Sequence, residues 1–316
     1  MLKLIGAAFA AALTAGLAQA QTVGIAVGNP GSLYHNAGTA IAKVANEAGM
    51  KVTIQPMTSP TQYIPVVNAG DVEFGLGNLQ EVREGVLGES YFKGRPNEHL
   101  KAVSVLFPLK NGLWVRKDSD IKSVADLKGR RVAAGYTAQK TLQQVLLGVL
   151  ATGGLTLDDI EAVPVPTVVA GAEAFMAGEV DAFIFAVGSS KVREVEASVG
   201  GIRGVTIADT PENVKAMREF FPAAYLYQQE PGPGAPGIDG PTNVLTYPAL
   251  IFASDQTPED LVYEMTKVLH DNKKGMAEVF VNFKEFEQKE MVADLAPLSY
   301  HPGAIKYYKE QGLWKE

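Results

Sequence analysis

The stretch Ala177-Gly178-Glu179-Val180-Asp181-Ala182-Phe183-Ile184 repeats the pattern of Ala69-Gly70-Asp71-Val72-Glu73-Phe74-Gly75-Leu76, 108 residues earlier in the chain. Each copy has a glycine turn, a valine between two acidic residues and an apolar run that is typical of a buried strand. A Gly-acidic turn is common, so one such match could arise by chance. The elements around both copies follow the same order, which favours a duplicated β-α-β-α-β unit.

The first unit begins with the apolar stretch 22–27, which predicts a buried strand. The loop Gly28-Asn29-Pro30-Gly31-Ser32 follows it. A helix is expected next, because four apolar residues recur at the spacing of one buried face: Ala37, Ile41, Val44 and Ala48. A strand at 51–55 and a short helix at 61–68 then lead to the first copy of the repeat.

The second unit follows the same plan, with strands at 131–135 and 160–165 and a helix at 168–176. Between the two strands lies an amphipathic helix whose apolar face comprises Leu142, Val145, Leu146, Val149 and Leu150. Alternating strands and helices predict parallel sheets with right-handed crossovers. The sequence therefore predicts an α/β protein of two lobes, and ligands of such sheets bind beyond the carboxyl ends of the strands. If the lobes face each other, one cleft lies between them.

We expect a signal peptide at 1–20, lobe I at 21–112 plus 246–316, and lobe II at 113–245. Strands are predicted at 103–106, 113–116 and 244–253, with a turn between the first two; the Pro/Gly-rich segment 231–237 predicts a loop. A helix is predicted to start with Thr257 as cap and Pro258 in the first position. A final helix opens at His301-Pro302-Gly303, and this helical tail is expected to complete lobe I.

The composition excludes several classes of function. The 316 residues carry a formal net charge of −7, which argues against a general nucleic-acid partner. The chain has no cysteine, so it has no disulfide, no thiolate metal site and no cysteine nucleophile. Neither a cofactor nor a metal is predicted.

The N-terminus predicts export. A positive start at Lys3 precedes an apolar run at 4–17, and Ala18-Gln19-Ala20 is a small-x-small cleavage site. The alternative is a membrane anchor, but that run is shorter than the roughly 20 residues a spanning helix needs. We expect cleavage after Ala20 and a periplasmic location, with no cysteine to carry a lipid.

The first candidate binding loop lies where the first strand turns into a helix. Its candidate residues are Asn29, Gly31, Ser32 and Tyr34, because glycines admit a ligand to the backbone and the first amides of a helix favour an anion. The spacing matches neither nucleotide-binding glycine pattern. An ordinary turn with Ser32 as helix cap is the alternative.

The equivalent loop of the second unit supplies Tyr136, Thr137, Gln139 and Lys140. A lysine adds positive charge near an already positive helix end, which suits an anionic or carboxylate ligand. A solvated lysine on the helix flank is the alternative for Lys140, and a capping role is the alternative for Thr137.

Further strand ends are expected to meet the same cleft. Thr58 and Ser59 follow the second strand of lobe I, Asn78 ends its third, and Gly188 follows the matching strand of lobe II. Asn78 would orient a carboxylate or an amine, or cap the next helix. No catalytic residues are proposed, because the four histidines are scattered and no nucleophile elbow occurs.

The sequence resembles the TAXI-type solute receptors of tripartite ATP-independent periplasmic (TRAP) transporters. Five segments carry the resemblance: the first loop followed by Ser32-Leu33-Tyr34, the turn at 68–73 leading to Asn78, the lead-in at 126–132, the turn at 177–183 and the ending at 301–310. They are specific in combination and extend over essentially the whole mature chain.

The resemblance implies a periplasmic type II binding-protein fold that closes over a small organic carboxylate, such as a glutamate-like amino acid or a C4–C5 dicarboxylate or oxo acid. It also implies a monomer that delivers this solute to a TRAP permease in the membrane. A receptor for an ABC importer and an enzyme on the same fold remain as alternatives.

Overall fold

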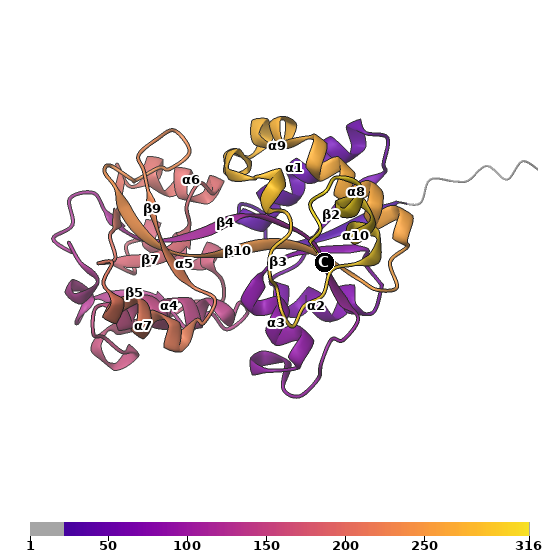
Figure 1. Cartoon of the computed structure of the whole chain (residues 1–316). Coiled ribbons are helices and arrows are strands. Elements are labelled where there is room, and N and C mark those ends of the chain that lie inside the picture. The colour runs from indigo at the N-terminus through magenta and orange to yellow at the C-terminus, as the bar shows by residue number, and fades with distance from the viewer. Residues whose placement is uncertain (1–21, 316) are drawn as a thin grey trace, which may run out of the picture.

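The computed structural model describes residues 22–315, and these form two α/β lobes joined by two long strands (Figure 1). The expected two-lobe α/β fold is confirmed. The predicted signal peptide and its cleavage site lie outside the described residues, so they stay predictions. Within the described part of the chain, no helix is long and apolar enough to span a membrane.

Lobe I is built from both ends of the described chain. Its own strands are β1 (Val23–Val27), β2 (Val52–Pro56) and β3 (Phe74–Asn78). Its helices are α1 (Leu33–Glu47), α2 (Pro60–Asn68), α3 (Leu79–Leu87), α8 (Glu259–Asp271), α9 (Lys273–Val279) and α10 (Pro302–Glu310), with 3-10 turns η1 (Ser90–Phe92), η4 (Val281–Glu285) and η5 (Gln288–Glu290).

Lobe II is built from the middle of the chain. Its strands are β5 (Arg131–Ala134), β6 (Glu161–Pro164), β7 (Ala182–Ala186), β8 (Ile202–Val205) and β9 (Tyr225–Gln229). Its helices are α4 (Thr141–Thr152), α5 (Val168–Met176), α6 (Ser190–Ser198) and α7 (Pro211–Phe220), with 3-10 turns η2 (Val124–Leu127) and η3 (Leu157–Asp159).

Two strands, β4 (Leu100–Arg116) and β10 (Thr242–Ser254), run through both lobes and pair with each other (Figure 1). The prediction of two strands separated by a turn at 108–112 was wrong, because β4 is continuous there. Pro108 lies opposite Pro248, beyond the ends of the flanking strands β3 and β7. A proline is tolerated at such a place because no neighbouring strand needs its missing N–H.

The strand order shows the duplicated plan directly. Lobe I has the order β2-β1-β3-β10 and lobe II the order β6-β5-β7-β4, each with three parallel strands and one antiparallel crossing strand. The second acid of each sequence repeat has the same contact. The carboxylate of Glu73 accepts from the amide of Gly24 at 2.6 Å, and that of Asp181 accepts from the amide of Arg131 at 3.0 Å. The repeat therefore joins the closing turn of each lobe to its first strand.

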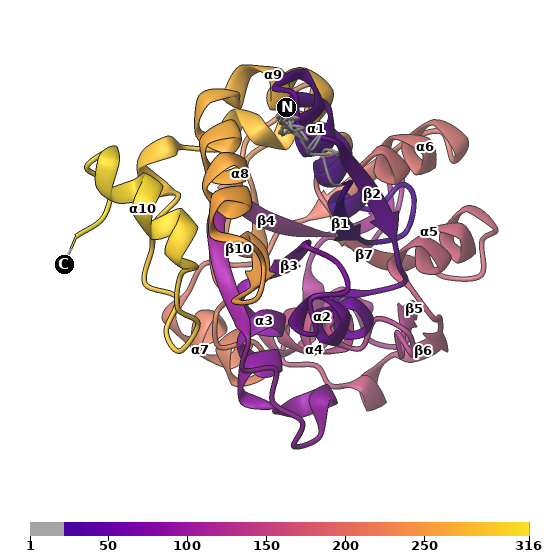
Figure 2. The same cartoon turned by 90° about the vertical axis from the view of Figure 1, so that its right-hand side faces the viewer.

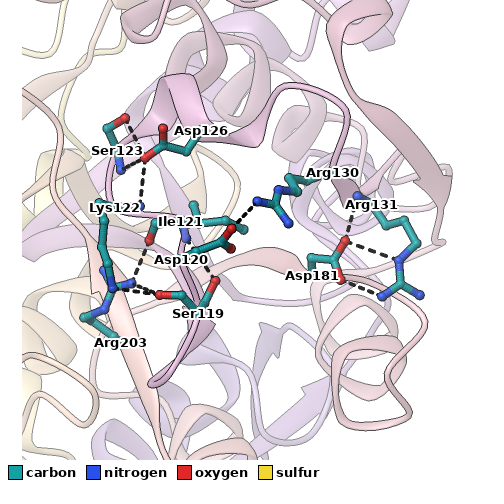
Figure 3. Close-up of polar contacts among 10 residues, drawn as sticks. All are labelled: Ser119, Asp120, Ile121, Lys122, Ser123, Asp126, Arg130, Arg131, Asp181 and Arg203. Atoms are coloured by element: carbon teal, nitrogen blue, oxygen red, sulfur yellow. Dashed lines mark hydrogen bonds and ion pairs between the residues drawn. The ribbon is translucent and has the colours of Figure 1, made fainter.

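In lobe II this contact is part of a larger polar cluster (Figure 3). The guanidinium of Arg131 pairs with Asp181 at 2.5 Å and also donates to the carbonyl of Gly178. Nearby, the carboxylate of Asp126 accepts from the amide and the hydroxyl of Ser123, which closes the expected capped turn. The segments at 126–132 and 177–183 thus hold the strands of lobe II in place.

The C-terminal helices return to lobe I, as expected, where α8 and α9 pack on α1 and α10 packs on α8 (Figure 2). Two local predictions were wrong. Ala48 is exposed because it follows the end of α1. Helix α8 begins one residue later than predicted: Pro258 occupies the cap position, and the hydroxyl of Thr257 donates instead to the carbonyl of Glu73.

Candidate ligand-binding site

A cavity of about 70 Å³ lies between the two lobes, and both lobes and both crossing strands line it. Its volume limits an enclosed ligand to a small molecule. The wall is mainly apolar, with a few polar side chains. Its lining residues are Gly28, Ser32, Leu33, Tyr34, Pro60, Asn78, Glu81, Leu109, Asn111, Gln139, Thr141, Leu142, Val168, Phe185, Ala186 and Tyr247.

The N-termini of five helices surround this cavity. The lining includes the first residue of four of these helices and the cap residue of the fifth: Leu33 of α1, Pro60 of α2, Thr141 of α4, Val168 of α5 and Asn78 before α3. They converge because the carboxyl ends of the parallel strands in both lobes point to the cleft. Helix N-termini carry partial positive charge and free amides, so their convergence favours negative charge inside the cavity.

Asn78 and Glu81 form one polar unit on the wall. The Oδ1 of Asn78 accepts from the amide of Glu81 at 2.8 Å, so Asn78 caps α3. The Nδ2 of Asn78 donates to the Oε2 of Glu81 at 2.5 Å, which fixes the carboxyl group. Both residues are buried, and both line the cavity. Asn78 therefore caps α3 and also lines the cavity, while its contact with a ligand stays a prediction.

Glu81 has an unusual electrostatic environment. The pKa of its carboxyl group is raised to about 8, chiefly by burial; the hydroxyl of Thr141 opposes the shift and the nearby Glu84 adds to it. Among the described residues that line the cavity, none carries a positive charge that would stabilise the ionised form. The carboxyl group is therefore largely protonated near neutral pH.

Three more polar groups of the lining are buried, and each faces one polar neighbour without a hydrogen bond of good geometry among the described residues. The hydroxyl of Tyr34 faces Asn78, the amide of Asn111 faces Tyr247 and the hydroxyl of Thr141 faces Glu81. Polar groups in a cavity wall that are bonded only weakly to the protein can bind a polar ligand.

Hydrogen bonds join the two lobes beside the cavity. The Nε2 of Gln139 donates to the carbonyl of Thr58 at 2.7 Å, and the hydroxyl of Ser190 donates to the carbonyl of Gly31 at 3.4 Å. The Nε2 of Gln144 also donates to the Oε1 of Glu84 at 3.3 Å, across the boundary where the two lobes meet, which we call the seam. The structure thus shows the lobes in contact around a partly enclosed space.

Four of the residues proposed from the sequence line the cavity: Ser32, Tyr34, Asn78 and Gln139. Ser32 also caps α1, since its Oγ accepts from the amide of His35. Three other proposed residues, Gly31, Thr58 and Gly188, lie at the seam between the lobes; a side chain at Gly188 would meet Asn282 and the carbonyl of Gly234.

The remaining five proposed residues lie outside the cavity lining. Tyr136 is buried in lobe II and its hydroxyl donates to the carbonyl of Ala133, while Thr137 is exposed. Lys140 is also exposed, and its ammonium lies 5.6 Å from the centre of the Tyr91 ring. Asn29 accepts from the amide of Ser32, and Ser59 bonds to the hydroxyl of Thr61.

Sequence reasoning missed Glu81, Asn111, Thr141 and Tyr247. A signal for Glu81 was available, because an asparagine cap with a glutamate three residues later is a capping-box pattern. Asn111 and Tyr247 come from the two crossing strands, and no local pattern marks them. Within residues 22–315, no group of three His, Cys, Asp or Glu side chains is placed to hold a metal ion.

Comparisons with solved structures identify the same fold in known proteins. A structure from Bordetella bronchiseptica RB50 is 16% identical with a TM-score of 0.57, over 92% of this chain and 98% of that chain. A structure titled a periplasmic transporter is 13% identical with a TM-score of 0.57, over 92% and 93% of the two chains. A putative periplasmic sulfonate-binding protein, SsuA of a sulfonate ABC transporter from Methylobacillus flagellatus KT, is 17% identical with a TM-score of 0.52, over 93% and 95%.

At these identities the likeness is one of fold, namely the two-lobe α/β fold of periplasmic binding proteins. A family model described as the NMT1-like family matches residues 25–312, which is nearly the whole described chain. This description does not mention TAXI-type receptors, so the resemblance to them stays a prediction. The chain belongs to the NMT1-like family.

Proposed function

We propose that this protein is a periplasmic solute receptor that encloses a small organic carboxylate between its lobes and delivers it to a membrane transporter. One observation carries the proposal: a partly enclosed cavity lies between two lobes that hydrogen bonds join, and a few buried polar side chains line its wall. A mainly apolar wall with a few polar side chains is suited to binding a solute without catalysis. Export with cleavage after Ala20 is part of the proposal, and N-terminal sequencing of the mature protein tests it.

The preference for a carboxylate is supported by the helix N-termini around the cavity. Five of them bring the partial positive charge of their dipoles to one small volume, and this favours an anion without a lysine or an arginine. The hydroxyls of Tyr34 and Thr141 and the amide of Asn111 add donors for carboxylate oxygens. The acidic net charge gives no long-range attraction, so recognition is local.

A thermal-shift screen with matched ligands tests the ligand class. Butyrate, butyramide and n-butylamine have similar shapes and carry negative, no and positive charge; succinate, 2-oxoglutarate and L-glutamate extend the panel. A ligand at 100 times its dissociation constant stabilises the folded state by about 2.7 kcal/mol. We expect carboxylates to raise the melting temperature. If mass spectrometry found a neutral sugar bound to the purified native protein, this result would contradict the proposal that the ligand is a carboxylate.

The transporter partner is proposed from the sequence resemblance, which favours a TRAP permease. A receptor for an ABC importer is the second candidate, and the fold of the sulfonate-binding protein is compatible with it. Genes for a large TRAP permease beside this one would favour the first candidate, and genes for an ATPase and its permease the second. Product formed during incubation with a bound solute would instead indicate an enzyme.

A further inference from the structure

We infer that Glu81 meets the solute as a neutral carboxyl group that donates a hydrogen bond to the solute's carboxylate, so that each bound anion retains one proton on Glu81. The inference rests on the proposed function, in which the solute is a carboxylate. It makes Glu81 a specificity-determining residue, and it makes binding depend on pH.

The position of Glu81 supports this role. Glu81 is 4% exposed and lines the cavity, and the Nδ2 of Asn78 holds its carboxyl group at 2.5 Å. An ionised Glu81 beside a bound carboxylate would place two negative charges in one small desolvated space. Two neighbouring carboxylates in a desolvated space repel each other, which disfavours the ionisation of both. A proton held between them removes this repulsion.

The groups that face Glu81 come from six elements, and none of them is a cation. They are Tyr34 of α1, Tyr63 of α2, Glu84 of α3 itself, Tyr91 of η1, Thr141 of α4 and Tyr247 of β10. The ammonium of Lys140 lies beyond the ring of Tyr91, on the exposed side. Within residues 22–315, no positive side chain therefore faces Glu81 to balance two carboxylates.

The pKa of Glu81 agrees with this arrangement. Chiefly because of burial it is raised to about 8, so most empty receptors hold a proton on Glu81 at pH 7. A bound anion raises this pKa further, because it adds a second negative charge beside the first. A hydrogen bond from a carboxyl O–H to a carboxylate is short and strong.

The converse arrangement is an ionised Glu81 that accepts from a ligand ammonium. It would place a cation where five helix N-termini converge, and these partial positive charges disfavour it. The two arrangements differ in the direction of proton movement. An anion brings a proton onto Glu81, whereas a cation expels one.

Calorimetry in two buffers of different ionisation enthalpy measures this movement. The probe is the carboxylate that binds most tightly among butyrate, succinate, 2-oxoglutarate and L-glutamate. At pH 9 we expect uptake of nearly one proton per site, and at pH 7 uptake of about a tenth of a proton. We also expect about tenfold weaker binding at pH 9 than at pH 7, since most receptors must then be protonated before they bind.

Two variants complete the test. Glu81→Gln keeps a neutral donor at every pH, so the affinity that it has for the same probe at pH 7 should no longer decline toward pH 9. Glu89→Gln is the matched control, because Glu89 is exposed just beyond the same helix, and it should keep both the proton uptake and the decline. If Glu81→Gln does not fold, the wild-type calorimetry still decides.

The outcomes separate this inference from the proposed function. Carboxylate binding without proton uptake at pH 9, or with a pH decline that Glu81→Gln retains, overturns the inference and leaves the receptor for carboxylates standing. Stabilisation by n-butylamine alone, with proton release and with loss of binding in Glu81→Gln, overturns both. A panel in which no carboxylate binds also counts against both.

Discussion

The side-chain amide of Gln139 donates to the main-chain carbonyl of Thr58 at 2.7 Å and so joins lobe II to lobe I at the edge of the cavity. The carbonyl oxygen of the same side chain accepts from the amide of Val168 at 2.9 Å. Both ends of the side chain are thus occupied by the protein. Gln139 acts as a clasp that connects the first residue of α5 to the opposite lobe.

Gln139→Ala should weaken the contact between the lobes. Loss of the clasp leaves the carbonyl of Thr58 and the amide of Val168 to find water, at a cost of about 1–2 kcal/mol. We expect roughly five- to thirtyfold weaker binding of the tightest carboxylate probe and a larger radius of gyration by X-ray scattering. Gln311→Ala, at an exposed site after α10, is the control and should match wild type. Unchanged affinity in Gln139→Ala would contradict a clasp.

Gly188→Ala should destabilise the seam more than an ordinary glycine substitution. Gly188 has φ +81°, and an added Cβ would lie 2.4 Å from the Oδ1 of Asn282 and 2.9 Å from the carbonyl oxygen of Gly234. Gly200 has a similar φ of +76° with open space around it, so Gly200→Ala measures the backbone cost alone, about 1 kcal/mol. We expect Gly188→Ala to lose about 1–3 kcal/mol more in urea unfolding. Equal losses of stability in Gly188→Ala and Gly200→Ala would contradict this prediction, because they would show that Asn282 and Gly234 move aside at little cost.

Asp181→Ala should destabilise lobe II at neutral pH. Burial alone would raise the pKa of Asp181, but the hydrogen bonds and the charge of Arg131 lower it overall. The contact therefore stabilises the fold above the usual carboxyl range and is lost as the pH falls through the lowered pKa. Since both side chains are partly exposed, we expect a loss of about 1–2 kcal/mol at pH 7.

A matched control for Asp181 is Asp158→Ala, at an exposed carboxylate of the same lobe. It should unfold like wild type. The difference between Asp181→Ala and wild type should shrink below about pH 4, because the wild-type carboxylate then takes up a proton. A difference that stays constant from pH 7 to pH 2 would exclude an ionic contribution.

Glu81 should make the protein less stable as the pH rises. Its pKa is about 8 when folded, against an ordinary value of 4.5, so the folded state binds more protons between these values. The free energy of unfolding then falls from about pH 5 and levels off above about pH 8. We expect wild type to lose up to a few kcal/mol relative to Glu81→Gln across this range, measured by urea unfolding. Parallel curves for the two proteins would contradict the raised pKa.

Lys140→Ala tests the lysine proposed from the sequence. Because its ammonium is exposed and lies outside the cavity lining, solvent screens its attraction for a bound anion. We expect calorimetry to show a loss of affinity below about threefold. A loss within this range, or none, would show that Lys140 does not bind the ligand. A loss of tenfold or more would contradict the expectation and show that its ammonium contacts the ligand.

The sequence predicted the repeated parts of this fold well, because local patterns encode them. Apart from the exposed Ala48, the buried faces of α1 and α4 lie where the spacing places them, as do the paired turns at 69–76 and 177–184. The continuity of β4 was missed because a proline such as Pro108 usually ends a strand. The strand tolerates Pro108 because Pro248, which is distant in the sequence, lies opposite it in β10.

The candidate site was harder to predict, because tertiary structure assembles it. Ser32, Asn78 and Gln139 could be found as polar residues at strand ends. Asn111 and Tyr247 reach the cavity only because two strands cross between the lobes. Lys140 was chosen for its charge, yet the structure surrounds the cavity with helix ends and places that side chain outside.

The crossing strands also have a consequence for how such receptors diversify. The chain enters lobe II along β4 and leaves it along β10, and Asn111 pairs with Leu245 at the passage. Lobe II is therefore an insertion whose two ends are neighbours. Its exchange between relatives needs only two junctions, one in each crossing strand, and adds no new strand crossing. Both lobes contribute to the cavity wall, so such an exchange would create new ligand preferences while the outer surface of lobe I stays unchanged.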